Sequence, residues 1–277
     1  MARKIDADPL SSWRVPVGGK GFALKRRDPG AKPLSGGDKH ADKARVAELA
    51  REIDALQNLL FADRRFKLLI LLQGTDTAGK DGTIRAVFRE TSPLGVRTQA
   101  WQAPTELERS HDFLWRIHAQ VPRAGEIMIH NRSHYEDVLV PVVNGALDAA
   151  GTRQRCAQIN DFERMLSETG TVVMKFMLHI GFEEQRERLQ KRLDDPQARW
   201  KFSPADLTVR QQWAAYQQAY DALLRATSTD WAPWTVVPAD SKTHRNLMIA
   251  TLVRDKLKSL KLRYPPDNPE LKGLRVQ

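Results

Sequence analysis

A glycine-rich loop followed by a lysine is the feature of this sequence with the clearest chemical meaning. The apolar run 68–72 is followed by Gln73 and then by the loop Gly74-Thr75-Asp76-Thr77-Ala78-Gly79-Lys80-Asp81-Gly82-Thr83, which opens a helical pattern. A strand, a G-x-x-x-x-G-K loop and a helix in this order are typical of a phosphate site. Glycines let backbone amides point at phosphate oxygens, and the helix N-terminus adds partial positive charge. We therefore predict that phosphate binds to Gly74, Thr75, Ala78, Gly79, Lys80, Asp81, Gly82 and Thr83.

Two carboxylates distinguish this loop from the common pattern. Asp81 stands where a serine or threonine usually follows the lysine, and Asp76 lies inside the loop. Both would repel a bare polyanion, but hard divalent cations prefer carboxylate oxygens and could sit between them and the phosphates. Asp81 could instead cap the following helix. We predict a metal or catalytic role for Asp76 and leave both readings open for Asp81.

A second polar cluster follows the apolar run 126–130. It reads Asn131-Arg132-Ser133-His134-Tyr135-Glu136-Asp137. In P-loop enzymes an acid often stands directly after this strand and helps to hold magnesium. Here that position is the neutral Asn131, and Glu136 and Asp137 could supply the missing charge. Arg132 can grip two phosphate oxygens at once. The alternative is a charged surface loop with internal salt bridges, and we assign no metal role to His130 or His134.

A third cluster is basic and contains a helix breaker. Arg188 and Arg192 share one helix face, and Arg199 and Lys201 follow Pro196. A basic helix end with a hinge is suited to a lid that closes over phosphates. A solvated helix paired with nearby acids would show the same charges. The presence of a phosphate loop elsewhere in the chain favours the lid.

The elements that must position these clusters alternate along the chain. Apolar runs predict strands at 67–73, 95–100, 126–130, 171–180 and 235–238. Helical spacing is found at 41–62, 80–90, 105–119, 154–169, 183–193, 206–226 and 244–260. Alternation of this kind predicts a parallel five-stranded sheet with helices on both faces, and ligands at the carboxyl ends of its strands. We expect an extended basic arm at 1–44 and one domain at 45–277, with the lid at about 185–206.

Composition limits the class of protein. The chain has 277 residues, 41% of them hydrophobic and 28% charged, which is ordinary for a globular protein. Its longest apolar run is too short for a membrane span, and the N-terminus has no secretory signal pattern. The lone Cys156 excludes an internal disulfide, and we expect a cytoplasmic protein with this cysteine in its core. The net charge of +10 suits either a polyanionic partner or solubility alone, and the phosphate loop favours a phosphate-rich substrate.

Together these motifs resemble the polyphosphate kinase 2 family, whose members carry G-x-D-x-x-G-K-D-G-T after the first strand. The resemblance covers almost the whole chain. It includes Gly21-Phe22-Ala23-Leu24-Lys25, Ala103-Pro104-Thr105, Asp112-Phe113-Leu114-Trp115-Arg116 and Ser228-Thr229-Asp230-Trp231-Ala232-Pro233-Trp234. The form of the 131–137 run looks most like the short, single-domain class III branch, whose members phosphorylate both nucleoside monophosphates and diphosphates.

The resemblance implies a P-loop kinase-like fold and Mg²⁺-dependent phosphoryl transfer between inorganic polyphosphate and AMP or ADP. Mn²⁺ as the metal and guanine nucleotides as substrates are alternatives. The implied catalytic residues are Asp76, Lys80, Arg132 and Glu136, the metal ligands are Asp76 and Asp137, and Asn131, Arg188, Arg192, Arg199 and Lys201 would contact phosphates. Glu136 would allow both monophosphates and diphosphates to be accepted. Family habit implies a homo-oligomer, either a dimer or a tetramer.

Two other functions compete with this interpretation. An ATP-dependent nucleotide or small-molecule kinase would normally carry serine or threonine in place of Asp81. A basic P-loop protein that binds nucleic acid would show aromatic and basic residues interleaved on one surface, and the sequence shows this only in the predicted lid. We therefore expect neither a nucleic-acid partner nor a membrane partner.

Overall fold

The core of the protein is a parallel sheet, as the alternation of strands and helices predicts. The computed structural model describes residues 9–276. Its five strands are arranged in the order β2-β3-β1-β4-β5. They are β1 (Lys67–Gln73), β2 (Val96–Ala100), β3 (Ile127–Asn131), β4 (Thr171–His179) and β5 (Trp234–Pro238). All the strand pairs are parallel, so the carboxyl ends of all five strands meet at one edge.

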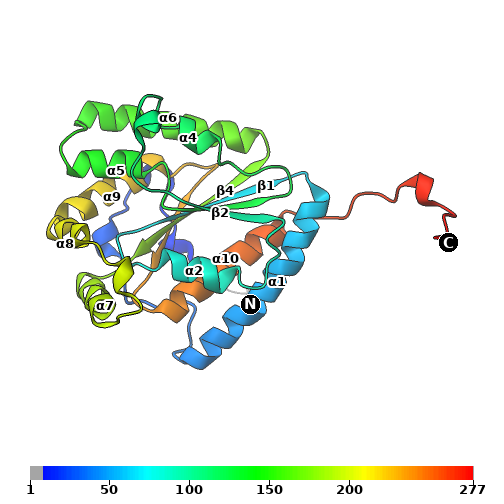
Figure 1. Ribbon diagram of the computed structural model, residues 1–277, viewed down its shortest axis with the longest axis horizontal. Helices are drawn as coiled ribbons and strands as arrows, with labels where there is room; N and C mark the ends of the chain where they lie inside the picture. The colour runs from blue at the N-terminus through cyan, green and yellow to red at the C-terminus, as the bar shows by residue number, and fades with distance from the viewer. Residues whose placement is uncertain (1–8, 277) are drawn as a thin grey trace, which may run out of the picture.

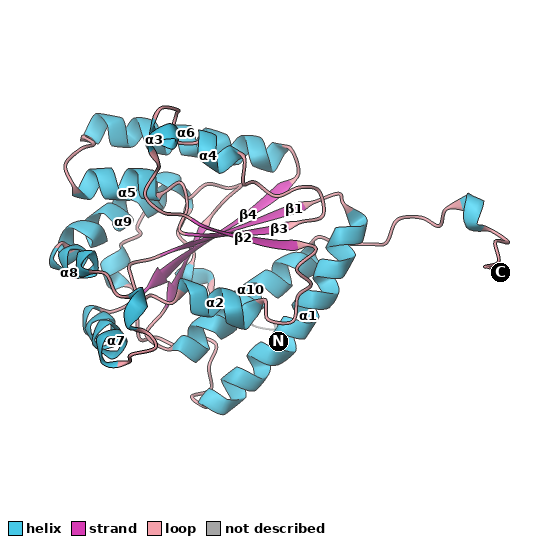
Figure 2. Cartoon of the chain, in the orientation of Figure 1, coloured by secondary structure: helices cyan, strands magenta, loops and turns pink. Residues whose placement is uncertain are grey.

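Helices cover both faces of the sheet, which is why its inner strands β1, β3 and β4 are mostly apolar and buried. In Figure 1, α1, α2 and α10 lie on one face, and α4, α5, α6 and α9 lie on the other. Helices α7 and α8 lie beside the strand ends (Figure 2). The helices are α1 (Lys39–Asp63), α2 (Lys80–Val87), α3 (Glu106–Arg109), α4 (Trp115–His118), α5 (Glu136–Val143), α6 (Ala149–Glu168), α7 (Phe182–Asp194), α8 (Pro204–Gln211), α9 (Trp213–Thr227) and α10 (Lys242–Ser259).

Two helix predictions need correction, and one further helix was not predicted. The helix expected at 105–119 is two short helices, α3 and α4, because the side chain of Asp112 accepts a hydrogen bond from the Leu114 amide and forms a turn between them. The helix expected at 206–226 is interrupted at Gln212, which separates α8 from α9. Helix α5 was not predicted, because its β-branched residues and the internal Pro141 disguise a helical segment.

The N-terminal segment packs against the body of the protein. Residues 1–8 of the predicted arm lie outside the described range. From residue 10 onward the segment contains three short 3₁₀ turns, and Leu10, Trp13, Val15, Phe22 and Leu24 are buried in the common core. The Val15 amide donates to the Trp234 carbonyl oxygen at 2.9 Å. This contact attaches the segment to the edge strand β5.

The C-terminal segment follows α10. After α10, Leu262 still packs against the core, and residues 264–276 then extend away from the body, with a 3₁₀ turn at Pro269–Leu271 (Figure 1). Cys156 is buried, as predicted. Within residues 9–276, no helix combines the length and the apolar content that crossing a bilayer would require.

Candidate active site

The glycine-rich loop joins β1 to α2 at the carboxyl edge of the sheet. Gly79 is the N-cap of α2 and has a φ of 101°. Its Cα faces Arg245 so closely that an added Cβ would lie 2.0 Å from Arg245 Nη1. At the other end of the loop, a Cβ on Gly74 would lie 2.6 Å from the Leu178 carbonyl oxygen. Glycine is therefore required at both positions, because the loop is wedged between β4 and α10.

Lys80 is the buried cation of this loop. Its Nζ donates to the carbonyl oxygens of Gly74, at 2.7 Å, and of Thr75, at 3.3 Å. Burial lowers the pKa of Lys80 to about 8, and the charge of Arg132 acts in the same direction, against Asp76, Glu136 and Asp81. The ammonium group is thus folded over the loop and held by backbone dipoles. An incoming phosphate could replace these contacts without rebuilding the loop.

Arg132 and Asp76 connect the second polar cluster to the loop. Strand β3 lies beside β1, with Asn131 opposite Leu72, so Arg132 follows directly beside the loop. The guanidinium donates from Nη2 to Asp76 Oδ1 at 2.6 Å. Burial works to lower the pKa of Arg132, but Glu136 and Asp76 outweigh it and raise the pKa. Arg132 also has a left-handed φ of 65°, an uncommon conformation for a residue with a side chain.

Asp81 and Asn131 contact each other across the mouth of the site. The Asn131 amide donates to Asp81 Oδ1 at 2.5 Å. The N-cap of α2 is Gly79, and Asp81 lies in the first turn without capping the helix. Its position agrees with the helix dipole but not with the capping alternative, and the carboxylate is directed toward the second polar cluster.

Glu136 and Asp137 are neighbours in sequence but point to different places. Glu136 accepts from Gln73 Nε2 at 3.2 Å, and burial raises its pKa against the charges of Arg132 and Lys80. Asp137 accepts instead from Arg116 Nη2 at 3.1 Å, and its backbone carbonyl accepts from Arg155. The Asp137 carboxylate is therefore paired with Arg116, and its predicted role as a metal ligand stays a prediction.

Two cavities of different chemistry meet at the loop. The larger one, about 770 Å³, we call the basic cavity, because its lining includes Lys80, Arg132, Arg188, Lys191, Arg192, Lys201, Lys242 and Arg245. The smaller one, about 360 Å³, we call the tyrosine cavity, because Tyr216 and Tyr220 of α9 line it opposite Glu136 and Val140 of α5. Asp76 and Arg132 line both cavities. The pair therefore stands at the junction of an electropositive space and one with a mixed aromatic, apolar and polar lining.

The basic cluster that we predicted as a lid divides into fixed and accessible residues. Arg188 is buried, and its guanidinium donates to the carbonyl oxygens of Thr77, Ala239 and Asp240 and to Glu184. It therefore fastens α7 to the phosphate loop. Arg192 and Lys201 line the basic cavity, as does the highly exposed Trp200. Arg199 is not part of this lining, and its Nε donates to the Leu193 carbonyl oxygen.

Sequence reasoning missed the cations at the start of α10. Arg245 is buried behind the loop and donates to the Ala78 carbonyl oxygen at 3.0 Å and to Thr83 Oγ1 at 2.8 Å. Burial lowers its pKa to about 9, and the charge of Arg188 contributes. Lys242 lines the same cavity. The signal that could have revealed them is the position of α10 directly after β5, where the strand-end rule applies again.

Tyr216 and Tyr220 of α9 lie four residues apart, a spacing that is typical of a core-facing stripe on a helix. Tyr220 is indeed buried in the common core, while Tyr216 is partly buried against it. Both also face the tyrosine cavity. The helical stripe therefore has two functions that its spacing alone does not distinguish.

Comparisons with known proteins agree with this geometry. Residues 36–265 match the family model described as polyphosphate kinase 2. The chain is 46% identical to an AMP/ADP-polyphosphate phosphotransferase of Meiothermus ruber, over 92% of this chain and 96% of the relative. It is 38% identical to an ADP-polyphosphate phosphotransferase of Rhodopseudomonas palustris, over 80% of this chain and 82% of the relative. The crystal structure of polyphosphate kinase 2 from Arthrobacter aurescens TC1 superposes with a TM-score of 0.90 at 42% identity, covering 96% of this chain and 95% of that one. The chain belongs to the polyphosphate kinase 2 family, and its fold is the P-loop kinase-like α/β fold that the motifs predicted.

Proposed function

We propose that this protein transfers phosphoryl groups between inorganic polyphosphate and adenine nucleotides, forming ADP from AMP and ATP from ADP. The observation that carries the proposal is the junction of the two cavities at Asp76 and Arg132. A phosphotransferase must bring a donor and an acceptor together at one point, and little covalent chemistry is then needed from the protein. The names of the relatives, which pair polyphosphate with AMP and ADP, support the same reaction.

The basic cavity suits the polyphosphate donor. Its cationic side chains come from the loop, from α7, from the segment after α7 and from α10, so charged groups of several elements face one space. A chain of phosphates presents negative charge along its whole length and can contact several of these groups in succession. Arg188 would contact phosphate from the buried side of the basic cavity, while Arg192 and Lys201 would contact it from the lid. The predicted contact through Arg199 would need this residue to leave the Leu193 carbonyl oxygen.

The tyrosine cavity suits the nucleoside of the acceptor. Its volume of about 360 Å³ and its mixture of aromatic, apolar and polar side chains are typical of a small-molecule site. A nucleotide bound there would direct its terminal phosphate toward Arg132. We propose that Glu136, which lines this cavity, permits both monophosphates and diphosphates, which corresponds to class III of the family. Guanine nucleotides are an alternative acceptor. The homo-oligomer and the cytoplasmic location stay predictions.

A divalent cation fits the loop. Asp76 and Asp81 both line the basic cavity, and Mg²⁺ is commonly bound by one or two carboxylates together with substrate phosphates and water. We propose that these two residues hold Mg²⁺, with Mn²⁺ as an alternative, because Asp137 lines neither cavity. Asp76 would then exchange its contact with Arg132 for the ion. The ion would neutralise charge on the transferring phosphate. Lys80 and Arg132 would stabilise the same group from the loop and from β3.

The test is a reaction with purified protein, Mg²⁺ and polyphosphate, in which AMP and ADP are supplied separately and products are resolved by chromatography. We expect ADP and then ATP from AMP. ATP from ADP alone would contradict class III but keep the reaction. Transfer from ATP to AMP, without transfer from polyphosphate, would show an ordinary nucleotide kinase instead.

A further inference from the structure

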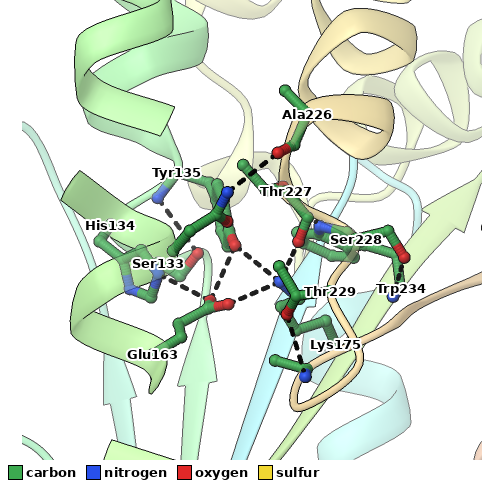
Figure 3. Close-up of polar contacts among 12 residues, drawn as sticks. Ser133, His134, Tyr135, Glu163, Lys175, Ala226, Thr227, Ser228, Thr229 and Trp234 are labelled. Atoms are coloured by element: carbon green, nitrogen blue, oxygen red, sulfur yellow. Dashed lines mark hydrogen bonds and ion pairs between the residues drawn. The ribbon is translucent and has the colours of Figure 1, made fainter. Parts of the chain in front are cut away.

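A closed network of buried polar side chains lies between the two helices that line the tyrosine cavity. It contains Glu163 of α6, Lys175 of the central strand β4, and His134 and Tyr135 just before α5 (Figure 3). Each of these side chains is at most 1% exposed. Neither cavity includes any of the four in its lining, so substrates do not reach them.

The Lys175 ammonium makes three hydrogen bonds, the full number that it can donate. They go to Glu163 Oε2 at 2.6 Å, to Tyr135 Oη at 2.9 Å and to the Thr227 carbonyl oxygen at 2.6 Å. The other carboxylate oxygen, Glu163 Oε1, accepts from Tyr135 Oη at 2.7 Å and contacts His134 Nε2 at 3.2 Å. Burial acts to raise the pKa of Glu163, but the charge of Lys175 outweighs it and holds the pKa below the ordinary value.

The partners of Lys175 belong to both walls of the tyrosine cavity. Tyr135 directly precedes Glu136, which begins α5 and lines the cavity. Thr227 is the last residue of α9, which supplies Tyr216 and Tyr220 to the opposite wall. Thr227 is itself held by Trp234 of β5, whose indole Nε1 donates to Thr227 Oγ1 at 2.9 Å (Figure 3). One ammonium group on a rigid strand therefore fixes the ends of both wall helices.

We propose that Lys175 and Glu163 are positioning residues that set the separation of α5 and α9, and with it the fit of the acceptor nucleotide. The proposal rests on the proposed function of the tyrosine cavity. A buried ion pair is a poor source of stability when compared with apolar residues of similar volume, so a role in geometry accounts better for a charge at the centre of the sheet.

The test compares the wild type with Lys175→Met/Glu163→Met, which removes both charges and leaves neither unpaired. Thermal unfolding and circular dichroism establish that the variant is folded. Tyr135→Phe, which removes one hydroxyl and keeps the ring, provides a milder second variant. Leu257→Ala is the matched control, because Leu257 is buried in α10 on the opposite face of the sheet.

We expect KM for AMP to rise on the order of tenfold in the double variant and less in Tyr135→Phe, while KM for polyphosphate changes by less than about twofold. Leu257→Ala should lose stability without changing either KM. A folded double variant with unchanged KM for AMP would overturn the proposal, as would equal rises in both KM values. A wild type that does not use polyphosphate would instead overturn the proposed function, and calorimetric titration with AMP would then test the network by the same comparison of binding constants.

Discussion

The buried cations on the two sides of the sheet have different kinds of hydrogen-bond partner. Lys175 meets a carboxylate and uses all three of its donors on fixed partners. Lys80 and Arg245, at the phosphate loop, are also buried, but the groups to which they donate in the described chain are carbonyl, hydroxyl and amide oxygens. The buried ammonium of Lys175 is thus paired directly with a carboxylate, whereas neither buried cation at the loop donates to one.

This difference distinguishes charges that hold the fold in place from charges that are available to bind a ligand. A buried charge without a counter-charge costs stability, and such a cost persists where it contributes to binding or catalysis. At the loop the missing negative charge is the one that a phosphate would bring. In the network the charges are satisfied before any ligand binds, so they can hold helices in place. The following predictions test whether the two sets of charges behave as differently as this comparison requires.

Lys80→Ala should give the largest loss of activity. We expect kcat to fall on the order of 10²–10³-fold, because one preorganised charge at the transferring phosphate is lost. Steady-state kinetics at saturating Mg²⁺, polyphosphate and AMP would measure the change. Lys256→Ala is the matched control, because it removes the same charge from the exposed surface of α10. Activity of Lys80→Ala within about threefold of the wild type would contradict the role of this residue.

Lys175→Met alone should give the largest loss of stability. It leaves Glu163 buried without its cation, and we expect the free energy of unfolding to fall by about 3–5 kcal/mol. Urea denaturation would measure this value. Adding Glu163→Met should restore most of the loss, since the unpaired charge is then removed. If the single and double variants were equally unstable, the unpaired charge of Glu163 would not be the cause of the loss.

Arg245→Met should separate stability from binding. The free protein should change by no more than about 1 kcal/mol, because the lost hydrogen bonds are offset by removal of a charge that lacks a carboxylate partner. Polyphosphate affinity should fall by roughly tenfold, or about 1.4 kcal/mol. Thermal unfolding with and without polyphosphate would show both effects. If Arg245→Met were as unstable as Lys175→Met and bound polyphosphate as the wild type does, Arg245 would be a structural charge like Lys175.

The pH dependence of activity should reveal the lowered pKa of Lys80. In the free enzyme Lys80 loses its proton near pH 8, so kcat/KM for polyphosphate should fall as the pH rises above this value. The stability contribution has the opposite sign. Between pH 8 and the ordinary lysine range the unfolded chain binds more protons, so the free energy of unfolding contributed by Lys80 rises with pH.

A profile of kcat/KM from pH 6.5 to 9.5 would test this, with Lys80→Arg as the comparison. Arginine stays charged throughout this range, so the variant should lose the alkaline fall even if its overall rate is lower. A wild-type profile that remained level up to pH 9.5 would show that the charge of Lys80 does not limit the reaction.

Much of the site could be predicted because its residues are close in sequence to strand ends. Gly74 and Gly79 identify a tight loop by themselves, and Arg132 follows an apolar strand that parallel pairing brings beside β1. The outcome for Glu136 and Asp137 shows the limit. Both begin an unpredicted helix, and the helical turn between them directs one into the tyrosine cavity and the other to Arg116.

The sequence by itself determined the alternation of strands and helices, the phosphate loop and the family, because these depend on local spacing and backbone preference. Only the tertiary structure decided which distant side chains meet. Arg245 reaches the loop from the last long helix, and Lys175 meets Glu163 because α6 packs on β4. Such contacts depend on strand order and on the rotation of each packed helix, and no short stretch of sequence encodes either.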